Sequence, residues 1–252
     1  MIKNIVFLHG LAGSKAGFIE LENLVARDPR VQTYAFDLLG FGENSTAIGE
    51  FTIEEHRAHI TKKIQERFSN QSVTLIGYSM GGVLALDWTL HNQSQVQKLI
   101  LIATPLPENA KEARKAITYG ESSKLNWGYF ILNHPWFSFF SCKILCRLNF
   151  MRFFKFLKPA YISDQIFKDY HLHSWNSLKK SFYSTVINYP AVDVISKITI
   201  TPILNIVASQ DNPLMRKHPN QSNVKTVEIN GNHHLLLTQT KKVYELIKEF
   251  VS

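Results

Sequence analysis

Short, continuously apolar runs alternate with amphipathic segments over most of the chain. Residues 2–8 and 31–37 are rich in β-branched and aromatic side chains, which predicts two buried parallel strands. Between them, residues 15–27 carry apolar side chains at helical spacing: Phe18, Leu21, Leu24 and Val25. A strand, a helix and a second strand in this order predict a βαβ unit.

The same alternation continues toward both ends of the chain. Residues 51–68 predict a helix, with a capping box formed by Thr52 and Glu55 and with one apolar face: Ile53, Ile60, Ile64 and Phe68. Further strands are expected at 72–76, 96–103, 201–208 and 224–229, and further helices at 82–91 and 241–251. The fold class is therefore α/β, with a doubly wound, mostly parallel sheet.

The middle of the chain has a different composition. From Leu106 to Pro190 the pattern is long, aromatic and helical, without a convincing strand. Residues 111–180 hold 12 Lys and Arg against 4 Asp and Glu, and residues 119–175 hold 16 of the 30 aromatic side chains. We interpret residues 106–190 as a helical insertion in an α/β core domain made of residues 1–105 and 191–252.

The formal net charge of +8 is located in this insertion. No nucleic-acid recognition motif accompanies the charge, so we expect no nucleic-acid partner. A solvated helix face explains the charge best. An attraction for acidic substrates or a weak contact with anionic lipid surfaces stays open.

Targeting and redox signals are sparse. No apolar run reaches the roughly 18 residues of a transmembrane helix, and the first residues do not have the pattern of a secretion signal, so we expect a cytoplasmic protein. Cys142 and Cys146 are the only cysteines, too few for a disulfide framework, and we expect reduced thiols.

The segment GYSMGG, residues 77–82, joins a predicted strand to a predicted helix. A strand that turns abruptly into a helix holds Ser79 at the turn in a strained conformation, and side chains at positions 77 and 81 would collide with neighbouring backbone. The N-terminal amides of the following helix then face any negative charge that develops beside Ser79. G-x-S-x-G is a weak pattern alone, but here its strand–helix context is correct.

With this motif the chain resembles the α/β-hydrolase family over nearly its whole length. The matching segments are FLHGLAGS (7–14), FDLLGFGENS (36–45), GYSMGG (77–82), VASQDNPL (207–214) and NGNHHLLLTQ (230–239). The family commonly has two strands ahead of the one that ends in HG, and this chain enters that strand almost at once. The resemblance therefore implies about six strands, and a helical cap for the insertion.

The resemblance also implies a catalytic triad. Ser79 is the expected nucleophile, His233 the base and Asp211 the acid that orients the base. His234 competes with His233 for the role of base. The family places a glycine before this histidine, and Asn232 stands there in this chain, which is the next most tolerant residue for a left-handed backbone.

Backbone amides of Leu11 and Met80 are the expected oxyanion hole. We expect His9 and Asp37 to organise loops rather than take part in the chemistry. The other histidines and the two cysteines lack the arrangement of a metal site, so we predict no metal and no cofactor.

The function implied is a serine hydrolase that cleaves a small-molecule carboxylic ester or thioester through an acyl-enzyme intermediate. A serine at this turn argues against dehalogenases and epoxide hydrolases, in which the family uses aspartate. Carbon–carbon bond hydrolysis, amide cleavage, acyl transfer and a ligand receptor or signalling role stay open. Aromatic residues of the insertion are equally compatible with an acyl pocket and with packing of the cap: Phe150, Phe153, Phe154 and Phe156.

Overall fold

The computed structural model describes residues 3–118 and 160–252, except residue 214. The strands are β1 (Lys3–Leu8), β2 (Val31–Ala35), β3 (Val73–Tyr78), β4 (Val96–Ile102), β5 (Ile203–Ala208) and β6 (Val224–Ile229). Outside the predicted insertion the helices are η1 (Lys15–Phe18), α1 (Ile19–Val25), η2 (Gly42–Asn44), α2 (Ile53–Phe68), α3 (Met80–His91), α9 (Ala191–Lys197), α10 (Leu235–Thr238) and α11 (Thr240–Val251). This alternation confirms the predicted α/β class.

The strands form one six-stranded sheet in the order β2-β1-β3-β4-β5-β6. Every neighbouring pair is parallel, so the sheet is wholly parallel among the described residues, where the sequence predicted a mostly parallel one. The chain winds outward in both directions from β1 and β3. In sheets of this kind, ligands bind at the carboxyl ends of the strands, near the point where the strand order reverses. In this sheet that point lies at β1 and β3.

Each face of the sheet is covered by its own hydrophobic cluster, because successive side chains of a strand point to opposite faces. In β1, Val6 and Leu8 pack with α2, α3 and α9, whereas Ile5 and Phe7 pack with α1 and α11. The strands are therefore buried on both sides, which explains why their sequences are apolar without interruption.

Two local details differ from the sequence-based expectation. The helix predicted over 15–27 is divided into a 3-10 turn, η1, and the α-helix α1. The capping box of α2 is only half formed: Thr52 accepts a hydrogen bond from the amide of Glu55, but the Glu55 carboxylate accepts from the amide of Phe51 instead of that of Thr52. Phe51, which donates that hydrogen bond, has a positive φ of 51°.

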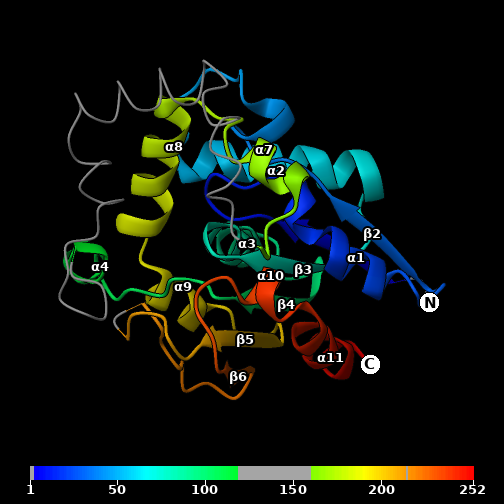
Figure 1. Ribbon diagram of the computed structural model, residues 1–252. Helices are drawn as coiled ribbons and strands as arrows, with labels where there is room; N and C mark the ends of the chain where they lie inside the picture. Colours follow the sequence, from blue (N-terminus) through cyan, green and yellow to red (C-terminus); the bar gives the residue numbers. More distant parts are fainter. Residues whose placement is uncertain (1–2, 119–159, 214) are drawn as a thin grey trace.

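The described parts of residues 106–190 are helical, as predicted. They contain α4 (Ala110–Thr118), α7 (Asp164–Asp169), α8 (Trp175–Ser181) and a π-helical turn, η5 (Phe182–Ile187). Figure 1 shows α4 and α8 together on one side of the molecule, away from both chain ends. The two cysteines and the four phenylalanines at 150–156 lie outside the described residues, so the predictions made for them and the division into core and cap stay predictions. No helix of the described chain is long and apolar enough to cross a membrane.

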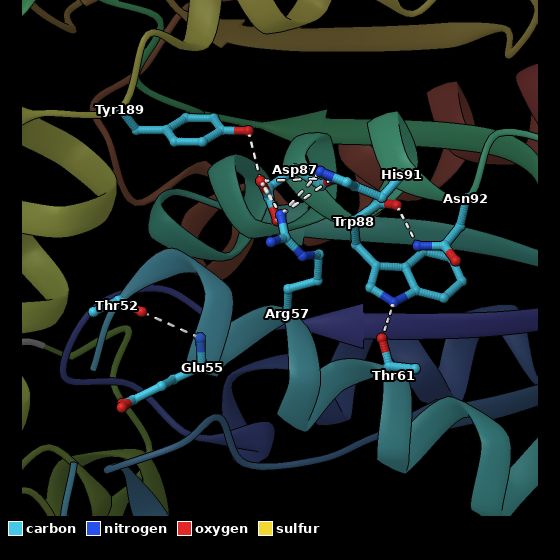
Figure 2. Close-up of polar contacts among 9 residues, drawn as sticks. All are labelled: Thr52, Glu55, Arg57, Thr61, Asp87, Trp88, His91, Asn92 and Tyr189. Carbon is cyan, nitrogen blue, oxygen red and sulfur yellow. Dashed lines mark hydrogen bonds and ion pairs between the residues drawn. The ribbon is translucent and has the colours of Figure 1, made fainter. Parts of the chain in front are cut away.

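A buried carboxylate connects α3 with α2 and with the segment that returns from the predicted cap. Asp87 is only 2% exposed. Arg57 of α2 donates to both of its oxygens at 3.0 Å, and the hydroxyl of Tyr189 donates to Oδ1 at 2.9 Å (Figure 2). Burial raises the pKa of Asp87, and the Tyr189 hydroxyl and Arg57 oppose that rise. The charge is tolerated inside the protein because these donors replace the water that burial removes.

We expect Tyr189→Phe to lower the free energy of unfolding by about 1.5 to 3 kcal/mol, the contribution of a hydrogen bond to a charged group. Urea titration measures the change. Tyr244→Phe, in α11, is the matched control, because the Tyr244 hydroxyl hydrogen-bonds to no other residue of the described chain. An equal effect of the two substitutions would contradict a specific role for the Tyr189 hydroxyl.

A second buried polar group lies on the same helix α2. His56 is completely buried, and its Nε2 lies 2.9 Å from the hydroxyl oxygen of Ser181 in α8. Burial, assisted by the nearby His59 and His9, lowers the pKa of His56 from 6.5 to about 3. The folded protein therefore keeps this ring neutral at pH values where the unfolded chain protonates it.

This difference predicts a pH-dependent stability. The contribution of His56 is fully present above pH 6.5 and is lost as the pH falls from about 6.5 toward 3, because only the unfolded state takes up the proton in that window. His56→Gln removes the titrating group, so the free energy of unfolding should decrease less steeply with falling pH than in the wild type. Urea titrations at several pH values measure this. A wild-type slope in His56→Gln would contradict the expectation.

Candidate active site

Ser79 lies at the sharp turn between β3 and α3, as the motif predicts. Its backbone has φ 53° and ψ −121°, a conformation that costs a non-glycine residue about 1–3 kcal/mol. The turn is held from two sides: the Ser79 amide donates to the carbonyl oxygen of Ile102 at the end of β4, and the Gly82 amide donates to the carbonyl oxygen of Ser79, each at 2.9 Å. These contacts keep the serine side chain at the carboxyl edge of the sheet.

Close backbone contacts explain the glycines of the motif. A Cβ atom at Gly77 would lie 2.5 Å from the carbonyl oxygen of Gly81, and a Cβ atom at Gly81 would collide with the carbonyl oxygen of Leu8 in β1. Helix α3 therefore packs so closely against the ends of β1 and β3 that only glycine fits at positions 77 and 81.

The structure brings the three predicted triad side chains together. The Ser79 Oγ lies 2.8 Å from the Nε2 of His233, and the Nδ1 of His233 lies 3.0 Å and 3.2 Å from the two carboxylate oxygens of Asp211. The distances fit a ring that donates an Nδ1–H to the Asp211 carboxylate, which as an anion only accepts, and that accepts a hydrogen bond from the Ser79 hydroxyl at Nε2. This arrangement can draw a proton from the serine.

Two loops hold Asp211 and His233 beside each other. The loop after β5 and the loop after β6 are joined by hydrogen bonds from the Ser209 amide to the Ile229 carbonyl and from the Gln210 amide to the Gly231 carbonyl, at 2.9 and 3.0 Å. The Asp211 side chain is 18% exposed and the His233 side chain 41%, so the acid is the more protected partner. The three side chains of the site thus follow the carboxyl ends of β3, β5 and β6.

Asn232 differs from the expectation. It is not among the described residues with positive φ, so the left-handed backbone suggested for this position is wrong. Its side-chain oxygen instead accepts a hydrogen bond from the His234 amide at 3.0 Å. A side-chain hydrogen bond two residues along the chain stabilises this turn without the conformation that would favour glycine.

The competing histidine, His234, points elsewhere. Its Nδ1 lies 3.4 Å from the hydroxyl of Tyr78, and that hydroxyl also lies 3.1 Å from the carbonyl oxygen of His233. These contacts of Tyr78 were not predicted from the sequence. The only signal for them is the place of Tyr78 directly before Ser79 in the motif, because its partners lie more than 150 residues away in the chain.

His9 and Asp37 make the contacts of loop organisers. His9 donates from Nδ1 to the carbonyl oxygen of Gly10 at 2.8 Å and accepts at Nε2 from the Leu38 amide at 3.0 Å. Burial lowers the pKa of His9, consistent with a neutral ring. The two oxygens of Asp37 accept from the amides of Lys15 and Glu43 at 2.7 and 2.9 Å. Neither residue hydrogen-bonds to Ser79, His233 or Asp211 through these contacts.

Two cavities meet at Ser79, His233 and Leu11. The β4-side chamber, of about 440 Å³, is bordered by the segment after β4, the loop of Asp211 and parts of residues 106–190, including Thr104, Ile117, Phe182, Val186, Met215 and Arg216. The β1-side chamber, of about 480 Å³, lies between the loop after β1 and the segment after His233, and includes Phe18, Tyr161, Ile162, Ile166, His234 and Leu237. A substrate bound at Ser79 can therefore extend in two directions.

The predicted oxyanion-hole residues border the same serine. Leu11 lines both chambers, and Met80 follows Ser79 as the first residue of α3. Within the described ranges, no group of three or more His, Cys, Asp or Glu side chains has the arrangement of a metal site. The absence of a metal or cofactor stays a prediction.

The close approach of α3 to β1 predicts a specific defect. Gly81→Ala should lower the free energy of unfolding by about 1–3 kcal/mol or more, because the added methyl group has to displace the backbone of β1. Gly17→Ala is the control, since a Cβ atom there meets nothing within 4 Å. Thermal or urea unfolding compares the two variants, and similar stabilities would contradict the close contact.

Comparison with known proteins agrees with this architecture. Residues 3–138, more than half of the chain, match the family model described as alpha/beta hydrolase fold. A curated relative, named a probable lysophospholipase (BODYGUARD 3) of Arabidopsis thaliana, is 26% identical over 157 residues, which are 58% of this chain and 32% of that protein. The chain thus matches about a third or less of the length of the first such relatives.

Solved structures share the fold at low sequence identity. An esterase from Exiguobacterium antarcticum superimposes with a TM-score of 0.70 at 20% identity, covering 99% of this chain and 91% of that one. An epoxide hydrolase gives a TM-score of 0.70 at 18% identity, covering 98% and 90%. Similarities at this level of identity establish the fold. Together with the family model, they show that the chain belongs to the alpha/beta hydrolase fold family.

Proposed function

We propose that this α/β-hydrolase is a serine hydrolase that cleaves a carboxylic ester or thioester through an acyl-enzyme intermediate. The observation that carries the proposal is the chain of contacts from the Ser79 hydroxyl through the His233 ring to the Asp211 carboxylate. A serine hydroxyl is a poor nucleophile unless a neighbouring base takes its proton, and this geometry supplies the base and its orienting acid.

In the proposed reaction, the Ser79 Oγ attacks the substrate carbonyl carbon while its proton passes to the His233 Nε2. The amides of Leu11 and Met80 stabilise the negative charge on the carbonyl oxygen. The tetrahedral intermediate then expels the alcohol or thiol, which takes the proton from Nε2. Water attacks the acyl-enzyme, again giving a proton to His233, and the acid leaves as that proton returns to the Ser79 oxygen.

The comparisons support an ester as the substrate class. The Arabidopsis relative is named a probable lysophospholipase, and the bacterial structural neighbour is named an esterase. The epoxide hydrolase shares the fold, but the serine at the turn favours acyl chemistry for this chain, because the expected nucleophile of that class is an aspartate. The two chambers offer space on both sides of Ser79 for the acyl and alcohol parts of an ester.

We also propose that residues 106–190 form a cap over this site. Ala116 of α4 and Ile117 beside it line the β4-side chamber together with Phe182 and Val186 of η5. Ile166 of α7 lines the β1-side chamber. Because apolar side chains of this segment line both chambers, the segment can shape the acyl and alcohol sites without contributing to the triad.

The test combines labelling and turnover. Wild-type protein should react covalently with a fluorophosphonate probe and hydrolyse members of a panel of short-chain p-nitrophenyl esters and acyl-thioesters. Ser79→Ala should lose the labelling and at least about 10⁴-fold in kcat/KM, because the nucleophile is removed. Ser196→Ala, an exposed serine on α9, is the control and should behave as wild type.

The base can be assigned in the same assay. His233→Ala should reduce kcat about as strongly as Ser79→Ala, and the double variant should be no worse than either, because the two groups act as one unit. Wild-type protein that neither reacts with the probe nor turns over any ester, while still binding a small molecule, would contradict the proposal and favour a ligand receptor.

A further inference from the structure

The side chain of His234 lies in the β1-side chamber, one residue after the proposed base. The Tyr78 hydroxyl contacts the carbonyl oxygen of His233 at 3.1 Å and the Nδ1 of His234 at 3.4 Å. A carbonyl oxygen only accepts, so the single hydroxyl hydrogen of Tyr78 is used there. The longer contact then requires His234 to donate its Nδ1–H to the Tyr78 oxygen.

This assignment determines the character of the other ring nitrogen. Burial and, secondarily, the nearby His233 lower the pKa of His234, which favours the neutral ring near pH 7. A neutral imidazole with a proton on Nδ1 has a lone pair on Nε2, so Nε2 is a hydrogen-bond acceptor. The ring of Tyr161 lies 5.6 Å from the His234 ring and restricts its orientation.

The surroundings of His234 are mainly apolar. Its Nε2 hydrogen-bonds to no other residue of the described chain, and the chamber walls include Phe18, Ile162, Ile166, Leu236 and Leu237. A ligand atom that donates a hydrogen bond to Nε2 gains an interaction that an apolar atom of the same size lacks. A few polar groups in a mainly apolar pocket give specificity, and here His234 shares the chamber with polar side chains that include Tyr161 and Tyr170.

We propose that the His234 Nε2 accepts a hydrogen bond from a hydroxyl group on the alcohol part of the substrate, so that esters of diols or polyols are preferred over esters of simple alkanols. The inference rests on the proposed function of Ser79 and His233. The leaving oxygen receives its proton from His233, whose ring borders both chambers, and this proposal assigns the alcohol part to the β1-side chamber. The β1-side chamber is bordered by the residues that directly follow His233 in the chain.

The kinetic test uses 2-hydroxyethyl butyrate and propyl butyrate, which differ by a hydroxyl in place of a methyl group. The ratio of their kcat/KM values measures recognition of the hydroxyl. We expect His234→Phe to reduce this ratio about fivefold, the effect of one hydrogen bond. His234→Gln, which keeps an acceptor oxygen, should restore part of the ratio. His218→Phe, an exposed histidine, is the control.

If His234 had only a structural role, the ratio of kcat/KM values would respond differently to its substitution. If His234 only supports Tyr78, His234→Phe should lower both kcat/KM values by the same factor and leave the ratio unchanged, and this outcome overturns the proposal. The ratio is informative because any general loss of activity or stability cancels in it.

A binding experiment separates this proposal from the proposed function. The ethers 2-butoxyethanol and 1-butoxypropane resemble the two esters but cannot be hydrolysed, so they are titrated by NMR into Ser79→Ala with and without His234→Phe. We expect tighter binding of 2-butoxyethanol and loss of that preference in the double variant. If no ester is turned over but this preference is found, the hydrolase function fails and the His234 site stands; no preference between the ethers overturns the site.

Discussion

The close packing of α3 against the ends of β1 and β3 is the constraint on which the site depends. Glycines at 77 and 81 allow the helix to start directly above the strands, and the left-handed backbone of Ser79 follows from that tight turn. The strain at Ser79 is tolerated because hydrogen bonds to the end of β4 and within the turn hold both sides of the residue. A looser contact would let the serine relax away from the imidazole.

Burial of α3 on nearly all sides gives this arrangement its rigidity and creates a second requirement. Residues 80–89 of the helix are all buried, and one of them is the carboxylate of Asp87. Arg57 and Tyr189 compensate that charge from α2 and from the segment that returns from the proposed cap. Helix α3, which begins directly after Ser79, is therefore held near its far end by α2 and by the segment that returns from the proposed cap. The proposed cap is thus linked to the site through polar contacts as well as apolar ones.

Tyr78 gives the site a further link. Its ring lies 5.7 Å from the ring of His233, and its hydroxyl binds the backbone of the same residue. The residue before the proposed nucleophile thus positions the segment that carries the proposed base. The same hydroxyl orients His234, so one side chain connects the proposed reacting groups with a candidate recognition group in the neighbouring chamber.

The sequence by itself determined the six strands, the helical segments at 15–27, 51–68, 82–91 and 241–251 and the strand–turn–helix at Ser79, because periodicity and glycine spacing act over a few residues and need no knowledge of distant partners. It did not predict the short helices α9 and α10. The tertiary structure decided which of two adjacent histidines reaches the serine, which amide the Glu55 carboxylate binds, and what compensates Asp87 inside an apolar helix. Asn232 shows the same limit at short range, since its side-chain hydrogen bond replaced the backbone conformation that its residue type suggested. Contacts between residues 30 to 155 positions apart arise only when the strands order themselves in the sheet and bring their carboxyl ends together, and local pattern contains no information on that order.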